Sequence, residues 1–288
     1  VIINYQSAIR SAEQIGFETE LIPRSFFQIG RAYQRMGFHF ESNVHYQILQ
    51  DRFPDNYPYT PDSYFFAGIN DRELQNFAEA VKSFNDFLTR DGDPELNGPA
   101  RFQLGDTYFS LKRYVEAKTE FDKGRRVSPD YASERPLLLF HMGETYYENA
   151  EFDVARVIYR TLLERYPDKS YTKLVGLRLG DFLREEGKEE EALKVYRQVI
   201  DKAPDEIRLR GKLRIANLLG DRPVGDDWRE ALKRFDEVGA EGKEHPVAQE
   251  ALLRKALTLT LHGEHQAAID AFEKLEAGLQ FFLVEPFF

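Results

Sequence analysis

Small, aromatic and proline residues recur along the chain at fixed distances within an otherwise amphipathic helical pattern. A Gly is followed twelve residues later by Ala or Ser, after four more by an aromatic residue, and after eight more by Pro. The complete pattern begins at Gly30, Gly105, Gly143 and Gly180. Variants of it begin at Gly68, Ala216 and Ala256. We call each of these first residues an anchor, and a recurrence of this length predicts a repeat architecture.

Each step of the pattern has a physical reason. Two antiparallel helices approach closely only where side chains are small, so the anchor and the later Ala or Ser mark a helix crossing. The aromatic residue lies on the same helix face and can fill the space between one helix pair and the next. Turn signals such as 112–114, 149–151 and 186–188 separate the two helices. Pro-Asp pairs, as at 54–55 and 167–168, are expected to end the second helix.

The pattern divides the chain into seven units within residues 23–280. The units start near residues 23, 61, 98, 136, 173, 209 and 249. Residues 1–22 are expected to be the remaining helix of an earlier unit or an N-terminal capping helix. Residues 281–288 are expected to be the start of a further helix or a tail. Ile9, Phe282 and Phe287 would present apolar surface at these ends, where the chain could self-associate. We expect them to lie against another molecule, to be folded back on the solenoid, or to be disordered.

These residues resemble the tetratricopeptide repeat (TPR) family, which has a small residue in the first helix, Ala and an aromatic in the second, and Pro at the end. The resemblance covers about residues 23–280. It implies an all-α, right-handed superhelical solenoid of about fifteen or sixteen helices. The endings Arg52-Phe53-Pro54 and Arg165-Tyr166-Pro167 are similar to those of longer TPR units in bacterial cell-envelope proteins.

Composition narrows the classes of partner. The chain has 288 residues, 42% hydrophobic and 31% charged, which is typical of a globular protein. Its net charge of −10 argues against a nucleic-acid surface, which needs clustered Lys and Arg, and favours a neutral or basic partner. Without cysteine there are no disulfides or thiolate metal sites. No apolar run is long enough for a transmembrane helix.

The sequence contains no recognisable catalytic or cofactor-binding motif, so we expect neither an enzyme nor a cofactor. His262 and His265, with Glu264 between them, could suggest metal ligands. They lie in an expected turn between two helices, which favours a solvated turn over a metal site.

The residues directly after three consecutive anchors are acidic: Asp106, Glu144 and Asp181. Stacked units would place them in a row on one surface. This row is interpreted either as a solvated acidic face or as part of a groove that receives basic or polar groups of a partner.

Four phenylalanines, Phe27, Phe65, Phe102 and Phe140, each lie three residues before an anchor. The TPR resemblance implies that this position faces the concave groove, and Phe109 and Tyr147 would extend the row. The alternative is that these rings pack against neighbouring helices. A contiguous apolar row favours a peptide-binding site. Arg31 is the one cation at the positions where TPR co-chaperones grip an acidic C-terminal peptide, so that clamp is absent.

One unit carries an insertion at residues 220–228. Asp227 and Glu230 have the spacing of a helix capping pair. Trp228 is expected to fill the space created by the longer loop, and a recognition role is the alternative.

The sequence therefore predicts a non-catalytic scaffold that binds a partner peptide or protein, apolar with basic residues, in its concave groove. We expect a periplasmic or envelope-associated assembly factor. The alternatives are a cytoplasmic scaffold of a signalling or secretion complex, and the substrate-selecting arm of a larger enzyme. Because the chain begins at Val1 without Met, we expect a processed or excised piece.

Overall fold

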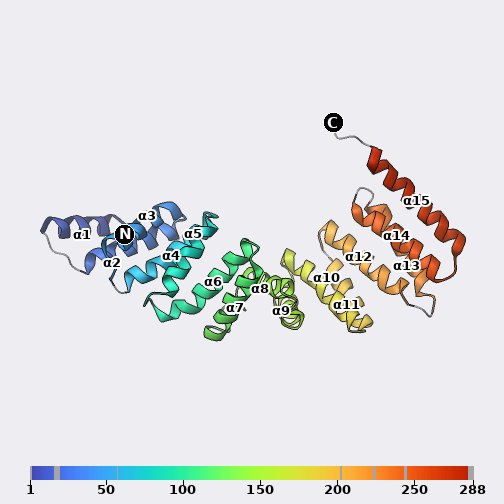
Figure 1. The fold of residues 1–288 in the computed structure, drawn as a ribbon, viewed down its shortest axis with the longest axis horizontal. Coiled ribbons are helices and arrows are strands. Elements are labelled where there is room, and N and C mark those ends of the chain that lie inside the picture. The colour runs from blue at the N-terminus through green and yellow to red at the C-terminus, as the bar shows by residue number, and fades with distance from the viewer. Residues whose placement is uncertain are drawn as a thin grey trace. The chain divides into compact units, whose positions relative to one another are not determined.

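The computed structural model of the chain describes residues 2–15, 20–56, 58–201, 203–222, 225–242 and 245–284, with side chains up to residue 276 except that of residue 15. Within these ranges the chain forms fifteen α-helices and one short 3₁₀ helix, and no β-strand. Figure 1 shows the helices in chain order. The predicted all-α solenoid of helix pairs is confirmed. The chain divides into an N-terminal part, Val1–Ile158, and a C-terminal part, Tyr159–Phe288, which we describe separately.

The N-terminal part begins with α1 (Ile2–Ile15), followed by antiparallel helix pairs. These are α2 (Leu21–Arg35) with α3 (His39–Arg52), α4 (Tyr59–Glu73) with α5 (Phe77–Leu88), and α6 (Asn97–Ser110) with α7 (Tyr114–Val127). The 3₁₀ helix η1 (Pro94–Leu96) precedes α6. Next come α8 (Pro136–Glu148) and α9 (Phe152–Arg165), and the boundary between the two parts falls within α9.

The C-terminal part contains three further pairs: α10 (Ser170–Glu185) with α11 (Glu189–Ile200), α12 (Asp205–Gly220) with α13 (Asp227–Glu241), and α14 (Pro246–Leu261) with α15 (His265–Val284). Residues 281–284 continue α15. No proline interrupts α15 before Pro286. The side chains of Phe282 and Phe287, expected to present apolar surface, lie outside the described residues.

The anchor glycines allow an aromatic ring of the same helix pair to lie directly on the first helix. A Cβ atom on Gly68 would stand 2.8 Å from the Phe84 ring, and one on Gly180 would stand 2.2 Å from the Tyr196 ring. Both rings are completely buried. The ring therefore fills the crossing inside its own pair, in addition to the expected space between pairs. Ala155 is also completely buried, as predicted.

The turns between paired helices share one backbone feature. The seventh residue after the anchor has a positive φ, and in half of these turns that residue is not glycine. The residues are Gly37, Gln75, Lys112, Ala150, Gly187 and Gly263, with φ between 58° and 80°. Because a left-handed residue reverses the chain after a helix, the turn signals at 112–114, 149–151 and 186–188 are explained.

Helix α1 packs on the first pair. Ile9 of α1 is 8% exposed and joins a cluster with Ile22, Phe26 and Leu49. Ile3, on the opposite face, is 74% exposed. A helix that covers the apolar face of α2 is compatible with both possibilities for residues 1–22, the remaining helix of an earlier unit and an N-terminal capping helix.

The first helices of neighbouring pairs pack on one another. In the N-terminal part α2 contacts α4, α4 contacts α6, and α6 contacts α8; in the C-terminal part α10 contacts α12, and α12 contacts α14. Among the described residues, second helices make no comparable contact with second helices of the next pair. Successive first helices therefore form the inner surface of each part, where a solenoid presents its concave face.

Candidate partner-binding surface

Two of the four predicted groove phenylalanines are core residues. Phe65 is 4% exposed and Phe102 is completely buried. The Phe65 ring packs on Phe84 and Phe87 of its own second helix, with ring centroids 6.1 and 5.6 Å apart. A buried ring offers no surface to a partner, so the expectation that these two residues line an open groove is corrected.

Phe102 is enclosed by the second helix of its pair and the loop that follows. Its ring lies 6.2 Å from that of Phe121 and stacks at 5.2 Å on Tyr131. A Cβ atom on Gly124 would stand 3.0 Å from the Phe102 ring, so the two helices are in close contact there. The alternative interpretation, in which these rings pack against neighbouring helices, holds for Phe65 and Phe102.

Phe27 is half-buried, and it lies at the contact between α2 and α4. Its ring centroid is 5.7 Å from that of Phe66 on α4. The Arg31 guanidinium lies 3.6 Å above the Phe66 ring, a cation–π contact. Arg31 also donates to Gln34 Oε1 at 2.9 Å. Phe66, which sequence reasoning missed, is thus the ring that α4 contributes to the inner surface.

The sequence contains a signal for Phe66. Residues 65 and 66 are both Phe, and neighbouring residues on a helix point about 100° apart. One of two adjacent rings can therefore enter the core of a pair while the other lies between first helices. A pattern based on a single position per unit selects Phe65 and overlooks its neighbour.

A polar network fixes α2, α3 and α4 relative to one another. The completely buried Asn70 donates from Nδ2 to Ser42 Oγ and Asn43 Oδ1, both at 2.8 Å. Its Oδ1 accepts from Gln34 Nε2 at 2.8 Å and lies 3.0 Å from His39 Nδ1. Because the amide uses its full hydrogen-bonding capacity, the network rigidifies this end of the inner surface.

The acidic residue after the third anchor is neutralised within the protein. Asp106 is 6% exposed, forms an ion pair with Arg72 of α4, and its Oδ1 lies 2.6 Å from His141 Nδ1 of α8. Burial opposes ionisation of this carboxyl. The His141 hydrogen bond and the Arg72 charge outweigh burial and hold the pKa of Asp106 below its ordinary value.

The remaining predicted residues are Phe109 on α6 and Phe140, Glu144 and Tyr147 on α8. Phe109 is half-buried and stacks on the His141 ring at 4.4 Å. Phe140 is half-buried, with its ring 5.7 Å from that of His141. Glu144 is 9% exposed, and Tyr147 is half-buried beside Phe152.

The predicted row of acidic residues, Asp106, Glu144 and Asp181, is neither a solvated acidic face nor part of an open acidic groove. Asp106 and Glu144 are buried, and Asp181 in the C-terminal part is bound by Arg214 Nε at 2.8 and 2.9 Å and by the Tyr196 hydroxyl at 2.7 Å. The carboxylates of Asp106 and Asp181 thus hold neighbouring first helices together. What remains accessible on the N-terminal part is a set of half-buried rings, which we call the inner seam: Phe27, Phe66, Phe109, Phe140 and Tyr147.

A separate cavity of about 270 Å³ lies among α3, α4 and α5. Asp71, 7% exposed, lines it and accepts from Asn43 Nδ2 at 2.7 Å and Ser83 Oγ at 3.3 Å. No cation pairs with Asp71 among the described residues. Burial therefore raises the pKa of this carboxyl to about 6.

The insertion and the histidine pair have structural roles. Trp228, 8% exposed, stacks on His262 at 4.7 Å, which supports its predicted role as a filler. Asp227 begins α13, but its carboxylate binds Arg222 at 2.6 Å, so the predicted capping pair with Glu230 is wrong. Among the described residues no cluster of His, Asp and Glu could hold a metal ion. No described helix has the length and hydrophobicity required to cross a bilayer.

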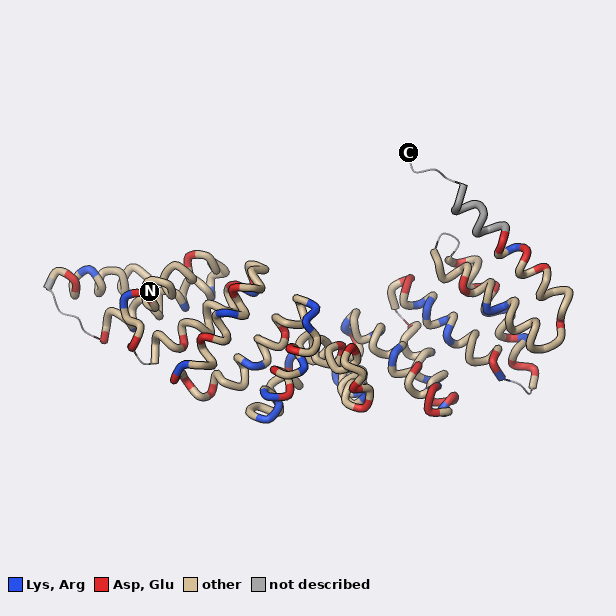
Figure 2. Tube along the Cα trace, viewed as in Figure 1, with Lys and Arg blue, Asp and Glu red and all other residues tan. Residues whose placement is uncertain are grey.

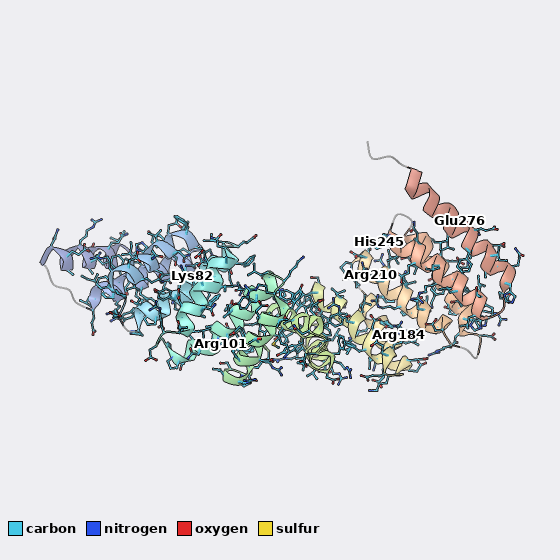
Figure 3. All side chains as sticks on the ribbon, viewed as in Figure 1. Lys82, Arg101, Arg184, Arg210, His245 and Glu276 are labelled. Atoms are coloured by element: carbon cyan, nitrogen blue, oxygen red, sulfur yellow. The ribbon has the colours of Figure 1, made fainter. Side chains whose placement is uncertain are left out.

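Figure 3 shows the side chains along both parts, with Arg101 labelled on α6. Arg101 binds Glu120 of α7 at 2.7 Å, so it ties the two helices of one pair together. The accessible chemistry of the inner seam is therefore mainly aromatic, on a frame whose polar groups are largely satisfied internally.

Comparisons with solved structures agree with this architecture. YrrB, described as a TPR protein with an unusual peptide-binding site, aligns with 72% of this chain and 97% of its own, at 16% identity and a TM-score of 0.56. A structure of MamA from AMB-1 aligns with 66% and 98%, at 17% identity and a TM-score of 0.50. The C-terminal part of a TPR repeat-containing protein from Cytophaga hutchinsonii aligns with 93% and 94%, at 16% identity and a TM-score of 0.49. No curated protein matches the chain in sequence.

Two family models, both described as tetratricopeptide repeat, match most of the chain. One matches residues 138–169 and 175–206, and the other matches 67–132 and 225–279. Together with the helix pairs and their anchor glycines, these matches show that the chain belongs to the tetratricopeptide repeat family.

Proposed function

We propose that the chain is a protein-binding scaffold, without catalysis of its own, whose inner seam takes up a helix or extended segment of a partner. The observation that carries this proposal is the series of half-buried rings on α2, α4, α6 and α8, from Phe27 to Tyr147. Aromatic rings held on a rigid frame supply large contact area at low entropic cost, and they often dominate peptide interfaces.

The partner segment is expected to be mainly apolar. The sequence suggested basic residues in the partner because of Asp106 and Glu144, but Asp106 is already paired with Arg72 and His141. The net charge of −10 still favours a neutral or basic partner over an acidic one at this surface. YrrB supports the general mode, since its description includes a peptide-binding site on a similar fold.

The proposal is tested by selecting a displayed random-peptide library on the immobilised chain. Replacing Phe27 and Phe66 together with Ala should weaken the selected peptides at least tenfold, because an interface ring is worth more than ~1.4 kcal/mol. Phe40→Ala is the matched control, since Phe40 is 69% exposed on α3, a second helix. Circular dichroism confirms that each variant is folded. Undiminished binding by a folded Phe27/Phe66 variant would contradict the proposal.

We further propose that this scaffold acts in the bacterial envelope. The support is the similarity of the Arg-Phe-Pro and Arg-Tyr-Pro unit endings to those of envelope proteins. Fractionation of the native host, followed by detection with an antibody, tests this location. Recovery in the cytoplasmic fraction would favour the alternative of a cytoplasmic scaffold.

A further inference from the structure

The third residue after the anchor is an aromatic or aliphatic side chain in every unit but one. Six units carry Tyr or Leu there: Tyr33, Tyr108, Tyr146, Leu183, Leu219 and Leu259. The unit that starts near residue 61 carries Asp71, on α4. Asp71 is 7% exposed, so its carboxylate is buried at a position where the other units bury or half-bury apolar surface. Packing alone therefore does not explain a charge at this position.

A tyrosine at this position fills the space toward the second helix of the preceding pair. Tyr146 of α8 reaches α7, where its hydroxyl donates to Asp122 Oδ1 at 2.6 Å. The equivalent space before α4 is the cavity of about 270 Å³, whose lining includes Gln47, the counterpart of Asp122 on α3. Because the Asp71 side chain is shorter than a tyrosine, the space in front of it stays open. We call this space the Asp71 cavity.

The lining of the Asp71 cavity offers hydrogen-bond acceptors. Gln47 Nε2 donates to Asp51 at 2.8 Å, and Gln50 Nε2 donates to Ser63 at 3.0 Å. The amide nitrogens of both glutamines are thus engaged, while their Oε1 atoms accept no hydrogen bond from any described residue. Together with the Asp71 carboxylate, these oxygens favour a ligand that donates hydrogen bonds.

The cavity also lacks positive charge. Glu79 and Asp86 of α5 line it together with Asp71, and Figure 2 shows acidic residues on both α4 and α5. Lys82, labelled in Figure 3, is the one basic residue of the lining, and it is exposed. Within the described part of the chain, none of the three acidic side chains forms an ion pair. The buried carboxylate of Asp71 is therefore left without a counterion.

We propose that the Asp71 cavity binds the guanidinium or ammonium group of an arginine or lysine side chain of a protein partner, with Asp71 as the carboxylate that pairs with it. A buried charge is costly while it is unpaired, so a cation that enters the cavity offsets a cost already present in the free chain. Arginine suits the site best, because its fork of N–H donors binds a carboxylate and neighbouring amide oxygens together.

Two other ligands fit the cavity less well. No three His, Asp or Glu side chains of the described residues converge closely enough to hold a metal ion. A free small amine has the required charge, but it gains nothing from the acidic surface around the cavity. A basic segment of a partner is attracted by Glu79 and Asp86, and by the net charge of −10 of the whole chain. The site lies between second helices, so binding here does not depend on the inner seam.

The probe is a blocked five-residue peptide with a central arginine between alanine and glycine residues. Binding to the whole chain is measured by isothermal titration calorimetry at high peptide concentration. The matched peptide carries citrulline, which has the shape of arginine without its charge. We expect the arginine peptide to bind, and the citrulline peptide to bind at least about tenfold more weakly, because one charge-assisted contact is lost.

The pH dependence gives a second readout. Burial raises the pKa of Asp71 to about 6, so about a tenth of this carboxyl is ionised at pH 5 and nearly all of it at pH 7.5. Affinity for the arginine peptide should therefore be about tenfold higher at pH 7.5 than at pH 5. The other titratable or charged groups at the cavity are Tyr64, Glu79, Lys82, Asp86, and Arg90, which lies over the Tyr64 ring.

Two substitutions of Asp71 test its role. Asp71→Asn should weaken the arginine peptide at least about tenfold at pH 7.5 and remove most of the pH dependence, because the other titratable groups stay in place. Asp71→Tyr restores the residue that Tyr146 represents in its own unit, and it should abolish binding by filling the cavity. Glu73→Gln is the matched control, since Glu73 is an exposed acid of α4 outside the lining. Circular dichroism confirms that each variant is folded.

The Phe27/Phe66 variant should bind the arginine peptide as the wild type does, so the outcome here is independent of the outcome at the inner seam. The proposal is overturned by absence of binding, by equal binding of the arginine and citrulline peptides, or by unchanged affinity in a folded Asp71→Asn variant. Guanidinium ion that binds as tightly as the arginine peptide would overturn the choice of a protein side chain as the ligand.

Discussion

Asp71 shows how one buried residue can set the pH dependence of stability. Burial raises its pKa from 3.8 to about 6, so the folded chain holds this proton more tightly than the unfolded chain does. Stability from this group is therefore complete below about pH 4 and is lost as the pH rises to about 6.

We expect Asp71→Asn to remove that loss. The amide keeps an oxygen acceptor for Asn43 and carries no charge, so the variant should gain ~1–3 kcal/mol relative to the wild type at pH 7 and little at pH 4. Urea unfolding at the two pH values measures the difference. Asp55→Asn, at an exposed turn after α3, is the control that should change neither value.

The left-handed turn residues give a second prediction at this scale. Ala150 has a φ of 58°, and the equivalent Gly187 has a φ of 74°. Glycine adopts this conformation without the steric cost that a Cβ atom imposes. Ala150→Gly should therefore stabilise the chain by ~0.5–1 kcal/mol, and Gly187→Ala should destabilise it by a similar amount. Thermal melting of both variants checks the sign, and a destabilised Ala150→Gly would contradict the argument.

At the scale of the element, the helix pairs were predictable because their determinants lie within one unit. The anchor glycine and the ring sixteen residues later, such as Gly68 and Phe84, are in direct contact, so their spacing records the crossing. The turn between the paired helices is predictable for the same reason, although its left-handed residue is glycine in only half of these turns. A contact within one unit therefore appears in the sequence as a constant number of residues between the two partners.

The binding face was less predictable because its determinants belong to different units. Whether Phe65 or Phe66 faces the next first helix depends on a rotation of about 100°, and the sequence offers a ring at both positions. The neutralisation of Asp106 depends on Arg72 in the unit before it and His141 in the unit after it. Contacts between residues of separate units depend on how the helices stack, so the sequence alone does not show which residues meet.

The buried position of Phe102 leads to a prediction for the pair α6–α7. Phe102→Ala should cost ~3–5 kcal/mol of unfolding free energy, because it leaves a cavity between Phe121 and Tyr131. Phe40→Ala on the exposed face of α3 should cost less than ~1 kcal/mol. Chemical unfolding of both proteins measures the contrast. Equal stabilities would mean that Phe102 lies at an accessible surface after all.

At the scale of the whole molecule, a solenoid transmits a local change mainly to its neighbours, because each unit packs only on those adjacent to it. Asp106 is a test of this property, since its carboxylate joins α4, α6 and α8 through Arg72 and His141. Asp106→Asn removes the negative charge while keeping the shape, and it leaves the Arg72 guanidinium, 20% exposed, without a counterion.

We expect Asp106→Asn to increase amide hydrogen exchange in α4, α6 and α8, with a local cost of ~1–3 kcal/mol, while α12 and α14 exchange as in the wild type. Hydrogen exchange read by mass spectrometry resolves these helices. Asp181→Asn is the reciprocal control, because its carboxylate joins α10 to α12, and it should spare α4 and α6. If either substitution accelerates exchange in every helix to the same extent, the chain unfolds as one cooperative body and the expectation of a local effect is wrong.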